Sequence, residues 1–229
     1  MLKLKPRTLL IGNFDGVHLG HQSLIEFAKK IARESDTELS ILTFKPHPRE
    51  VILNKKVDLI LPYFEKIKML KSFSVNSIDE IGFNKEISKM SPNDFISKFL
   101  EASGAVNIIV GKDFKFGIHA SGNVDTLVSY KKSLFKVHAI EIEHIVDKRI
   151  SSSLIKEFLS QGCICEVNRF LGRNYYIKGE VVEGEKRGRQ IGFPTTNLKT
   201  EWNLLPKEGV YVTYIFVNGK RYDGITNIG

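Results

Sequence analysis

The chain has 229 residues, of which 42% are hydrophobic and 26% are charged, and its formal net charge at pH 7 is +8. This composition is typical of a soluble globular protein, and the length fits one large domain or two modest ones. No apolar run is long enough to span a bilayer, and the N-terminal residues lack the apolar core of a secretion signal, so we expect a cytoplasmic protein. Cys163 and Cys165 stand without a second cysteine pair, which favours reduced thiols over a disulfide framework or a zinc site.

The excess of positive charge is spread along the chain. Pairs of lysines occur at residues 29–30, 55–56 and 131–132, and no basic helix or aromatic RNA-binding motif accompanies them. A basic surface attracts nucleic acid through its phosphate backbone. Because these lysines are dispersed, we expect a surface that serves solubility, with no nucleic-acid and no membrane partner.

Strand-like and helical segments alternate from the N-terminus to about residue 145. The expected strands are residues 9–11, 39–44, 78–83, 106–110 and 135–142, and the expected helices are residues 23–34, 62–73, 92–102 and 124–131. Ser91 and Pro92 are typical of a helix start. This alternation predicts a parallel sheet covered by helices. Ligands of such sheets bind beyond the carboxyl ends of the strands, so the turn after Ile11 and the loops after Phe44 and Val110 share one edge.

The pattern changes at about residue 173. Residues 175–182 and 209–217 alternate as β-strands do, and Asn218-Gly219 is typical of a hairpin turn. Glycines are frequent there, and no helical period appears. We therefore expect a second, antiparallel β domain, joined to the first by a helical region over residues 153–171.

The run from Gly12 to Gln22 carries the strongest signal for function. It reads Gly-Asn-Phe-Asp-Gly-Val-His-Leu-Gly-His-Gln and lies between an apolar strand and an amphipathic helix. In such a unit, backbone N–H groups and a helix N-terminus meet a phosphate. His18 and His21 project to one side of the first helical turn. The run matches neither a Walker loop nor the Rossmann glycine pattern, and two imidazoles over an anion-binding turn suit chemistry that builds negative charge on a triphosphate.

This run resembles the His-x-Gly-His element of the nucleotidylyltransferase superfamily, and in particular that of the bacterial FAD synthetases, which combine riboflavin kinase with FMN adenylyltransferase. Four later segments resemble the same family, namely residues 44–48, 110–117, 149–156 and 179–197. The resemblance implies an α/β fold: a Rossmann-like nucleotidylyltransferase domain with a parallel sheet over residues 1–155. It also implies a helical linker over residues 156–173 and an incomplete antiparallel β-barrel, similar to riboflavin kinase, over residues 174–229.

The resemblance also implies the reaction. A phosphate oxygen of FMN attacks the α-phosphorus of ATP, FAD and pyrophosphate are released, and Mg²⁺ carries part of the charge. His18 and His21 would bind the ATP phosphates and stabilise the transition state. Arg149 and Ser152 complete the implied catalytic set. In the second domain, the family phosphorylates riboflavin to FMN.

Further site residues are implied by their positions in the motifs. The implied ATP-binding residues are Gly12, Asn13, Phe14, Asp15, Gly16, Gly20, Ser151, Ser153 and Lys156. The implied FMN-binding residues are Phe44, Pro46, His47, Pro48 and Asp113. In the kinase domain the implied nucleotide-binding residues are Gly184, Gly188, Gly192, Thr195 and Asn197, of which Thr195 and Asn197 also hold Mg²⁺. Phe114 and Phe116 either contact a ligand or simply pack, and Lys156 stands where the family commonly has arginine.

We expect the second domain to be inactive as a riboflavin kinase by itself. The chain ends at Gly229, whereas members of the family continue with more barrel strands, a catalytic glutamate and a final helix. A barrel cut in mid-sheet would have unpaired edges.

Two other functions stay open at this point. One is a nucleotidylyltransferase for another phosphorylated acceptor, such as a nicotinamide or pantetheine phosphate. The other is a non-catalytic flavin- or nucleotide-binding module, or an RNA-binding protein that uses the basic surface. The kinase motif favours a flavin acceptor, and the intact His18 and His21 favour an enzyme.

Overall fold

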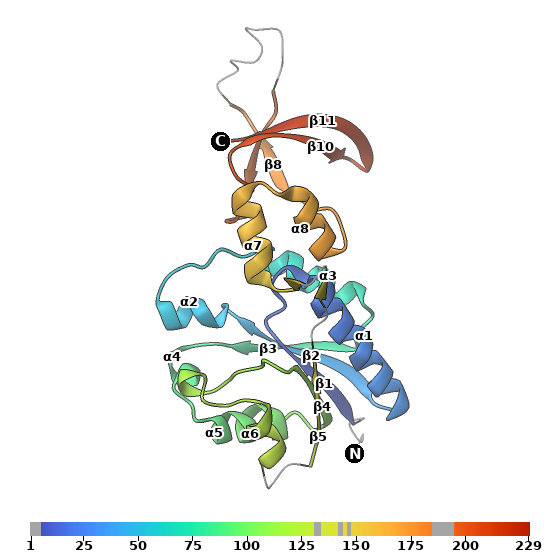
Figure 1. Ribbon diagram of the computed structural model, residues 1–229, viewed down its shortest axis with the longest axis vertical. Coiled ribbons are helices and arrows are strands. Elements are labelled where there is room, and N and C mark those ends of the chain that lie inside the picture. The colour runs from blue at the N-terminus through green and yellow to red at the C-terminus, as the bar shows by residue number, and fades with distance from the viewer. Residues whose placement is uncertain (1–5, 131–133, 142–143, 146–147, 185–194) are drawn as a thin grey trace. The chain divides into compact units, whose positions relative to one another are not determined.

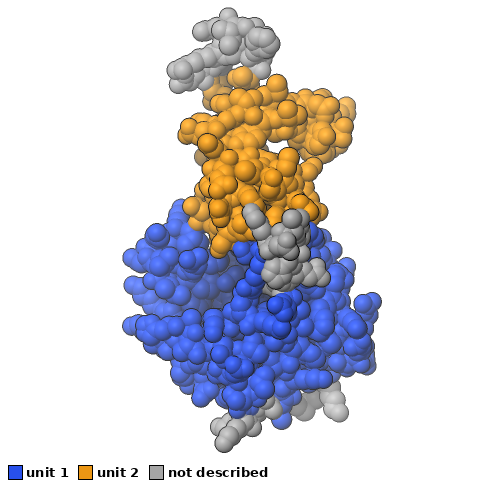
Figure 2. All heavy atoms as spheres, in the orientation of Figure 1, with its two compact units in different colours: residues 1–57, 63–151 blue, residues 58–62, 152–229 orange. Residues whose placement is uncertain are grey.

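The computed structural model describes residues 6–130, 134–141, 144–145, 148–184 and 195–229. The chain forms two compact units, which Figure 2 distinguishes by colour: Met1–Val57 with Tyr63–Ser151, and Asp58–Pro62 with Ser152–Gly229. Within the described ranges, no helix combines the length and the apolar character needed to cross a membrane.

The first unit is built on a five-stranded sheet (Figure 1). Its strands are β1 (Arg7–Ile11), β2 (Glu38–Lys45), β3 (Ser77–Gly82), β4 (Ala105–Gly111) and β5 (Lys136–Ile140). They lie in the order β3-β2-β1-β4-β5, and every neighbouring pair is parallel. The predicted α/β class and parallel sheet are confirmed. The chain winds away from β1 in both directions, and ligands of open sheets bind at such a switch point, beyond the carboxyl ends of the strands.

The apolar strands supply a core on each face of this sheet. Leu9 and Ile11 of β1 belong to a buried cluster that includes Phe95. Leu10, between them, belongs to the cluster on the opposite face, which includes Ile25. Successive side chains of a strand point to opposite faces. The sheet is therefore buried on both faces, which is why its strands read as continuous apolar runs.

Helices cover these two faces, and several differ from the prediction. They are α1 (Leu19–Glu34), α2 (Pro48–Leu53), α3 (Tyr63–Ser72), α4 (Lys85–Ser88), α5 (Pro92–Phe95) and α6 (Val124–Ser129). α1 starts four residues before its predicted start, because His18 caps it. The helix predicted over residues 92–102 is divided, since Ile96–Glu101 is π-helical. α2 and α4 are absent from the prediction because one or two turns carry too little periodicity.

The N-terminus of α5 is capped as its sequence predicts. The Ser91 hydroxyl accepts a hydrogen bond from the Asp94 backbone N–H at 3.2 Å, and Pro92 is the first helical residue. Ser91→Ala should therefore lower the free energy of unfolding by about 1 kcal/mol, measured by urea denaturation. Ser91→Thr keeps the accepting hydroxyl and is the control. An equal loss in both variants would contradict the cap.

The described part of the second unit contains two helices and two antiparallel strand pairs. The elements are α7 (Ser152–Gln161), α8 (Ile164–Leu171), β8 (Gly179–Val182), β9 (Asn197–Thr200), β10 (Gly209–Val217) and β11 (Lys220–Ile228). β8 pairs with β9, and β10 pairs with β11. Asn218 and Gly219 between β10 and β11 have φ values of 49° and 77°. Positive φ at both positions is typical of a type I′ turn, and the predicted hairpin is confirmed.

The helical region expected over residues 153–171 is confirmed, and it consists of two helices separated at Gly162, whose φ of 77° ends α7. One predicted strand of this unit is wrong in detail. The strand expected from residue 175 starts at Gly179. The Tyr175 hydroxyl donates to the Leu204 carbonyl at 2.8 Å, and the Tyr176 ring lies 5.8 Å from that of Trp202. These aromatic residues therefore anchor an irregular segment by packing.

Candidate active site

The turn after β1 has an unusual backbone. Phe14, Gly16 and Val17 have φ values of 53°, 80° and 42°, a region that residues other than glycine rarely occupy. The turn starts at Gly12, whose N–H donates to a β2 carbonyl at 3.1 Å, and passes through a single 3₁₀ turn, Asp15–Val17, into α1. Strain of this kind persists where surrounding contacts hold the backbone, and it clusters at functional sites.

The side chain of Phe14 belongs to the core. It is 0% exposed and packs in the same cluster as the apolar face of α1. Its ring also covers Gly12, where a Cβ atom would come within 3.0 Å of it. A contact from Phe14 to a nucleotide would therefore come from its backbone, and glycine at position 12 makes room for the ring.

His18 and His21 lie together at the N-terminus of α1. Their rings stack with centroids 3.7 Å apart and an interplanar angle of 16°. His18 is the N-cap residue, and its Nδ1 accepts a hydrogen bond from the His21 backbone N–H at 3.3 Å. Because Nδ1 accepts, a neutral His18 ring carries its proton on Nε2. Gly20, which lies between the two histidines in the sequence, is buried in the first turn of α1.

The His21 imidazole is held in its neutral form. Burial, His18 and Lys66 lower the pKa of His21 well below its usual range. Its Nδ1 is buried and has no hydrogen-bond partner among the residues that the structure describes. A buried nitrogen without a partner costs free energy, so a bound group that reaches this atom gains a favourable interaction.

Lys66 of α3 is a buried cation beside the turn. It is 7% exposed, and its Nζ donates to the Asn13 carbonyl oxygen and to the Thr43 hydroxyl, both at 3.1 Å. Asp15 is 6% exposed, and its carboxylate attracts the Lys66 ammonium group. The implied ATP-binding residues Asn13 and Asp15 are therefore linked to α3.

Burial of Lys66 should make folding stability depend on pH. Burial lowers the pKa of Lys66 to about 8, against the opposing effect of Asp15 and Glu80. The unfolded lysine has a pKa of about 10.4, so between these values the unfolded chain binds more protons than the folded chain. Stability therefore rises with pH in this window. The charged Lys66 destabilises the fold by about 3 kcal/mol below pH 8, and this cost disappears above about pH 10.5.

The test compares the free energies of unfolding of the wild type and Lys66→Met from pH 7 to pH 10.5. The difference between the two proteins should change by about 3 kcal/mol, because wild-type stability rises relative to the variant. A difference that stays constant over this range would contradict the lowered pKa.

The end of β2 and the loop after it contain side chains with different roles. Phe44, near the end of β2, is 7% exposed and packs in the core, so its side chain has a packing role. His47 is the N-cap of α2, where its Nδ1 accepts a hydrogen bond from the Arg49 N–H at 3.2 Å, and Pro48 is the first helical residue. The segment is thus a helix start, and the predicted FMN residues His47 and Pro48 form it.

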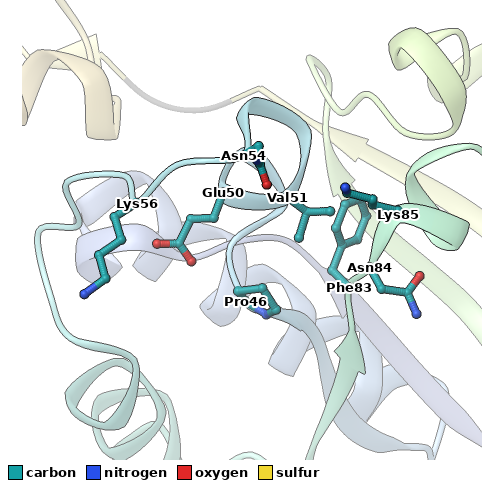
Figure 3. Close-up of a pocket in the computed structure, with 8 residues that line it drawn as sticks. All are labelled: Pro46, Glu50, Val51, Asn54, Lys56, Phe83, Asn84 and Lys85. Atoms are coloured by element: carbon teal, nitrogen blue, oxygen red, sulfur yellow. The ribbon is translucent and has the colours of Figure 1, made fainter.

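A pocket lies beyond the carboxyl ends of β2 and β3 (Figure 3). Its volume is about 500 Å³, and its lining residues are Pro46, Glu50, Val51, Asn54, Lys56, Phe83, Asn84 and Lys85. Phe83 and Val51 are apolar, Lys56 and Lys85 carry positive charge, and Glu50 carries negative charge. The pocket is wide open to solvent, although its volume falls in the range of small-molecule sites. Among the implied FMN residues the pocket includes Pro46.

An ion pair joins two implied site residues at the same edge of the sheet. Arg149 Nη2 lies 2.7 Å from Asp113 Oδ2. Asp113 follows β4, and Arg149 is the last residue of β7 (Lys148–Arg149), which pairs with β6 (His144–Ile145). Both side chains are about half exposed, so the pair adds little to stability. The guanidinium group can therefore exchange the carboxylate for a phosphate.

The two phenylalanines of the same loop pack. Phe116 is 7% exposed and belongs to the core. Phe114 stacks on it with ring centroids 5.4 Å apart. The structure therefore favours a packing role for both.

The remaining residues of the 149–156 motif fall in different units. Ser151 is the last residue of the first unit, whereas Ser152, Ser153 and Lys156 lie in the first turns of α7 in the second. A serine-rich helix N-terminus suits phosphate oxygens. Their roles stay predictions.

The implied kinase site lies between β8 and β9. A Cβ atom at Gly184 would meet the side-chain amide of Asn197, which would have to move. Thr195 and Asn197 are exposed. Gly188 and Gly192 lie outside the described residues. Across the parts of the chain that the structure describes, no group of three or more His, Cys, Asp or Glu side chains could hold a metal ion.

Sequence reasoning missed Lys66, although a signal was present. Lys66 lies four residues before Leu70, which is 0% exposed. Residues four apart share one face of a helix, so Lys66 lies on the face that α3 buries. A lysine at such a position needs buried partners.

Comparisons with known proteins agree with these features. A model of the FAD synthetase family matches residues 2–154, and a model of the riboflavin kinase family matches residues 171–229. Two relatives named bifunctional riboflavin kinase/FMN adenylyltransferase are similar to this chain. The one from Listeria monocytogenes is 35% identical over 226 residues, which cover 97% of this chain and 72% of that protein. The one from Bacillus subtilis is 37% identical over 224 residues, which cover 96% and 71%.

A solved structure is also similar. The crystal structure of a macrolide-efflux protein from Streptococcus pneumoniae superposes with a TM-score of 0.88 at 27% sequence identity. The match covers 98% of this chain and 74% of that one. The two chains therefore share their fold over nearly all of the present sequence.

Proposed function

The chain belongs to the family of bifunctional riboflavin kinase/FMN adenylyltransferases, and we propose that its adenylyltransferase site lies at the carboxyl edge of the parallel sheet, around His18 and His21. The reaction belongs to FAD biosynthesis: AMP is transferred from ATP to FMN, which gives FAD and pyrophosphate. The observation that carries the assignment is the histidine pair, stacked at 3.7 Å. It lies at the N-terminus of α1, directly beyond the strand at which the sheet changes direction.

The transfer needs charge stabilisation and positioning. An FMN phosphate oxygen forms a bond to the α-phosphorus, the bond to the β-phosphate oxygen breaks, and pyrophosphate leaves with the electron pair. Two imidazoles at a helix N-terminus, where the macrodipole favours anions, can hydrogen-bond the phosphate oxygens as their charge grows. His21 would act as a neutral donor or acceptor, because its imidazolium form is disfavoured. No covalent intermediate is required.

The acceptor phosphate would lie near the loop after β2. The neighbouring open pocket, lined by Pro46, Phe83, Glu50 and two lysines, has room for part of a planar ring system, and its two lysines outnumber the one carboxylate. Arg149 would bind a substrate phosphate in place of Asp113, since guanidinium groups bind both anions with the same planar geometry. Gly12, Asn13, Asp15, Gly16 and Gly20 would contact ATP through the turn.

Mg²⁺ would supply part of the positive charge on the phosphates. It binds proteins through one or two oxygen ligands and completes its shell with phosphates and water. In the kinase domain, the Thr195 hydroxyl and the Asn197 amide oxygen are donors of this type, and they would hold the ion. ATP and FMN are the small-molecule substrates of this family. We also propose that the protein is cytoplasmic, where both substrates are available.

The second unit would contain the riboflavin kinase part. The family model over residues 171–229 supports this assignment. We retain as a proposal the division into an adenylyltransferase domain over residues 1–155, a helical linker over 156–173 and a kinase domain over 174–229.

The test is a comparison of acceptors. The purified chain is incubated with ATP and Mg²⁺ and with FMN, nicotinamide mononucleotide or phosphopantetheine, and pyrophosphate release is measured. We expect release with FMN, and its loss when EDTA removes Mg²⁺. Release with another acceptor at a higher rate than with FMN would overturn the flavin assignment, and no release with any acceptor would indicate a binding module.

A further inference from the structure

Lys66 connects three parts of the first unit at the edge where the site lies. Its backbone belongs to α3, and its Nζ reaches the Asn13 carbonyl in the turn after β1 and the Thr43 hydroxyl on β2, at 3.1 Å each. Lys66 is 7% exposed, and Thr43 is 0% exposed. A single buried ammonium group therefore joins the helix, the turn and the strand.

The turn that receives this contact needs support. Asn13 immediately precedes Phe14, the first of the residues with positive φ. At the other end of the turn, the Gln22 side chain donates to the Val17 carbonyl at 2.9 Å. Contacts to both ends hold the strained backbone in place. His18 follows directly, so the placement of the histidine pair depends on this turn.

We propose that Lys66 is a positioning residue for adenylyl transfer: by binding the Asn13 carbonyl and the Thr43 hydroxyl, it fixes the turn that sets His18 and His21 against the nucleotide phosphates. The inference rests on the proposed function of the histidine pair. Lys66 acts through the turn, because two of its three N–H donors are already used within the protein.

Lys66 also interacts electrostatically with the titratable groups around it. The titratable and charged groups that face Lys66 are Asp15 of the turn, His21 of α1, Glu80 of β3, Tyr63 of α3 and, across the Tyr63 ring, Lys45 of β2. Asp15 and Glu80 favour the ammonium form. The positive charge of Lys66 in turn lowers the pKa of His21, so its removal should raise that pKa.

A role in packing alone would not require a cation. Methionine is similar in length to lysine and fills buried space without the cost of desolvating a charge. Buried polar groups that reduce stability are retained where activity depends on them. Packing and positioning therefore predict different outcomes for the same substitution.

The experiment measures activity and stability of Lys66→Met beside a matched control. Lys68 is exposed on the same helix, and Lys68→Met removes the same charge outside the site. We expect Lys66→Met to lower kcat for FAD formation about 100-fold, with KM for ATP within about threefold and a melting temperature at or above that of the wild type. Lys68→Met should match the wild type, and Lys66→Arg should retain more activity than Lys66→Met.

A second variant covers the case in which Lys66→Met does not fold. Thr43→Val keeps the shape of a fully buried side chain and removes one of the two acceptors, so kcat should fall while the fold is maintained. A kcat within threefold of the wild type in folded Lys66→Met, or a fall in kcat that simply follows a fall in melting temperature, would overturn the proposal.

A spectroscopic measurement separates this proposal from the proposed function. Imidazole NMR signals report the pKa of His21 whether or not FAD forms. In Lys66→Met the His21 pKa should rise and the His18 signals should shift, whereas Lys68→Met should leave both unchanged. If the wild type makes no FAD, the function is wrong, and the His18 signals still decide whether Lys66 positions the pair, because the His21 pKa also rises when the charge of Lys66 is lost. Unchanged His18 signals in Lys66→Met would overturn the positioning role.

Discussion

Replacement of His18 by alanine should lower kcat for FAD formation by about 10³-fold, because the transition state loses a hydrogen-bond donor at the point where charge develops. His18 is 2% exposed and stacks on His21 at 3.7 Å, so water has little room to replace the lost imidazole. FMN binding, followed by flavin fluorescence, should change by less than threefold. The measurement is the rate of FAD formation at saturating ATP and FMN.

His18 also caps α1, and this second role needs its own control. His18→Asn keeps a side-chain acceptor at the N-cap and removes the imidazole. We expect this variant to recover the stability lost in His18→Ala and to remain inactive. His119, exposed and remote in sequence, provides the matched histidine, and His119→Ala should keep full activity. Full activity in His18→Asn would show that His18 serves the helix and not the reaction.

Replacement of Phe14 by alanine should lower the free energy of unfolding of the first unit by about 3–5 kcal/mol. The ring is 0% exposed, lies against the position of a Cβ atom at Gly12 and meets the His21 ring edge-on at 5.2 Å. Its removal leaves a cavity beneath the turn. Urea unfolding should be followed by far-ultraviolet circular dichroism, because the single tryptophan, Trp202, reports on the second unit.

The comparison for Phe14 is an exposed phenylalanine of the same unit. Phe64 is 71% exposed, and Phe64→Ala should change stability by less than about 0.5 kcal/mol. Phe14→Leu should cost less than Phe14→Ala, since it fills part of the cavity. A loss below about 1 kcal/mol in Phe14→Ala, with activity abolished, would instead assign the ring to nucleotide binding.

The first unit was largely predictable because its sheet is buried on both faces. Strands such as β4 are then nearly continuous apolar runs, which can be recognised without knowledge of their neighbours. Strand order was not predictable from these runs, since β1 and β4 look alike in composition. Elements of one or two turns, such as α2 and α4, and the break at Gly162 depend on local backbone geometry that a periodic pattern does not contain.

The candidate site, too, was predictable from the sequence only in part. The family resemblance implied His18, His21, Asp113 and Arg149 as site residues. The structure stacks the two histidines and pairs Asp113 with Arg149 at 2.7 Å, and the roles of all four stay predictions. Lys66 was missed because its partners, the Asn13 carbonyl and Thr43, are remote in sequence and meet it only after folding. Phe14 lies inside the motif, but its side chain faces the core. The position of a residue in a motif does not indicate the direction of its side chain.

The central claim is that this chain joins AMP to FMN at the histidine pair, and chromatographic separation of flavins tests it most directly. The purified wild type and the His18→Asn variant are each incubated with ATP, Mg²⁺ and FMN. We predict FAD and an equal amount of pyrophosphate from FMN with the wild type, and no FAD with His18→Asn. FMN that binds to the wild type but stays unconverted, or FAD formed equally by both proteins, would contradict the account.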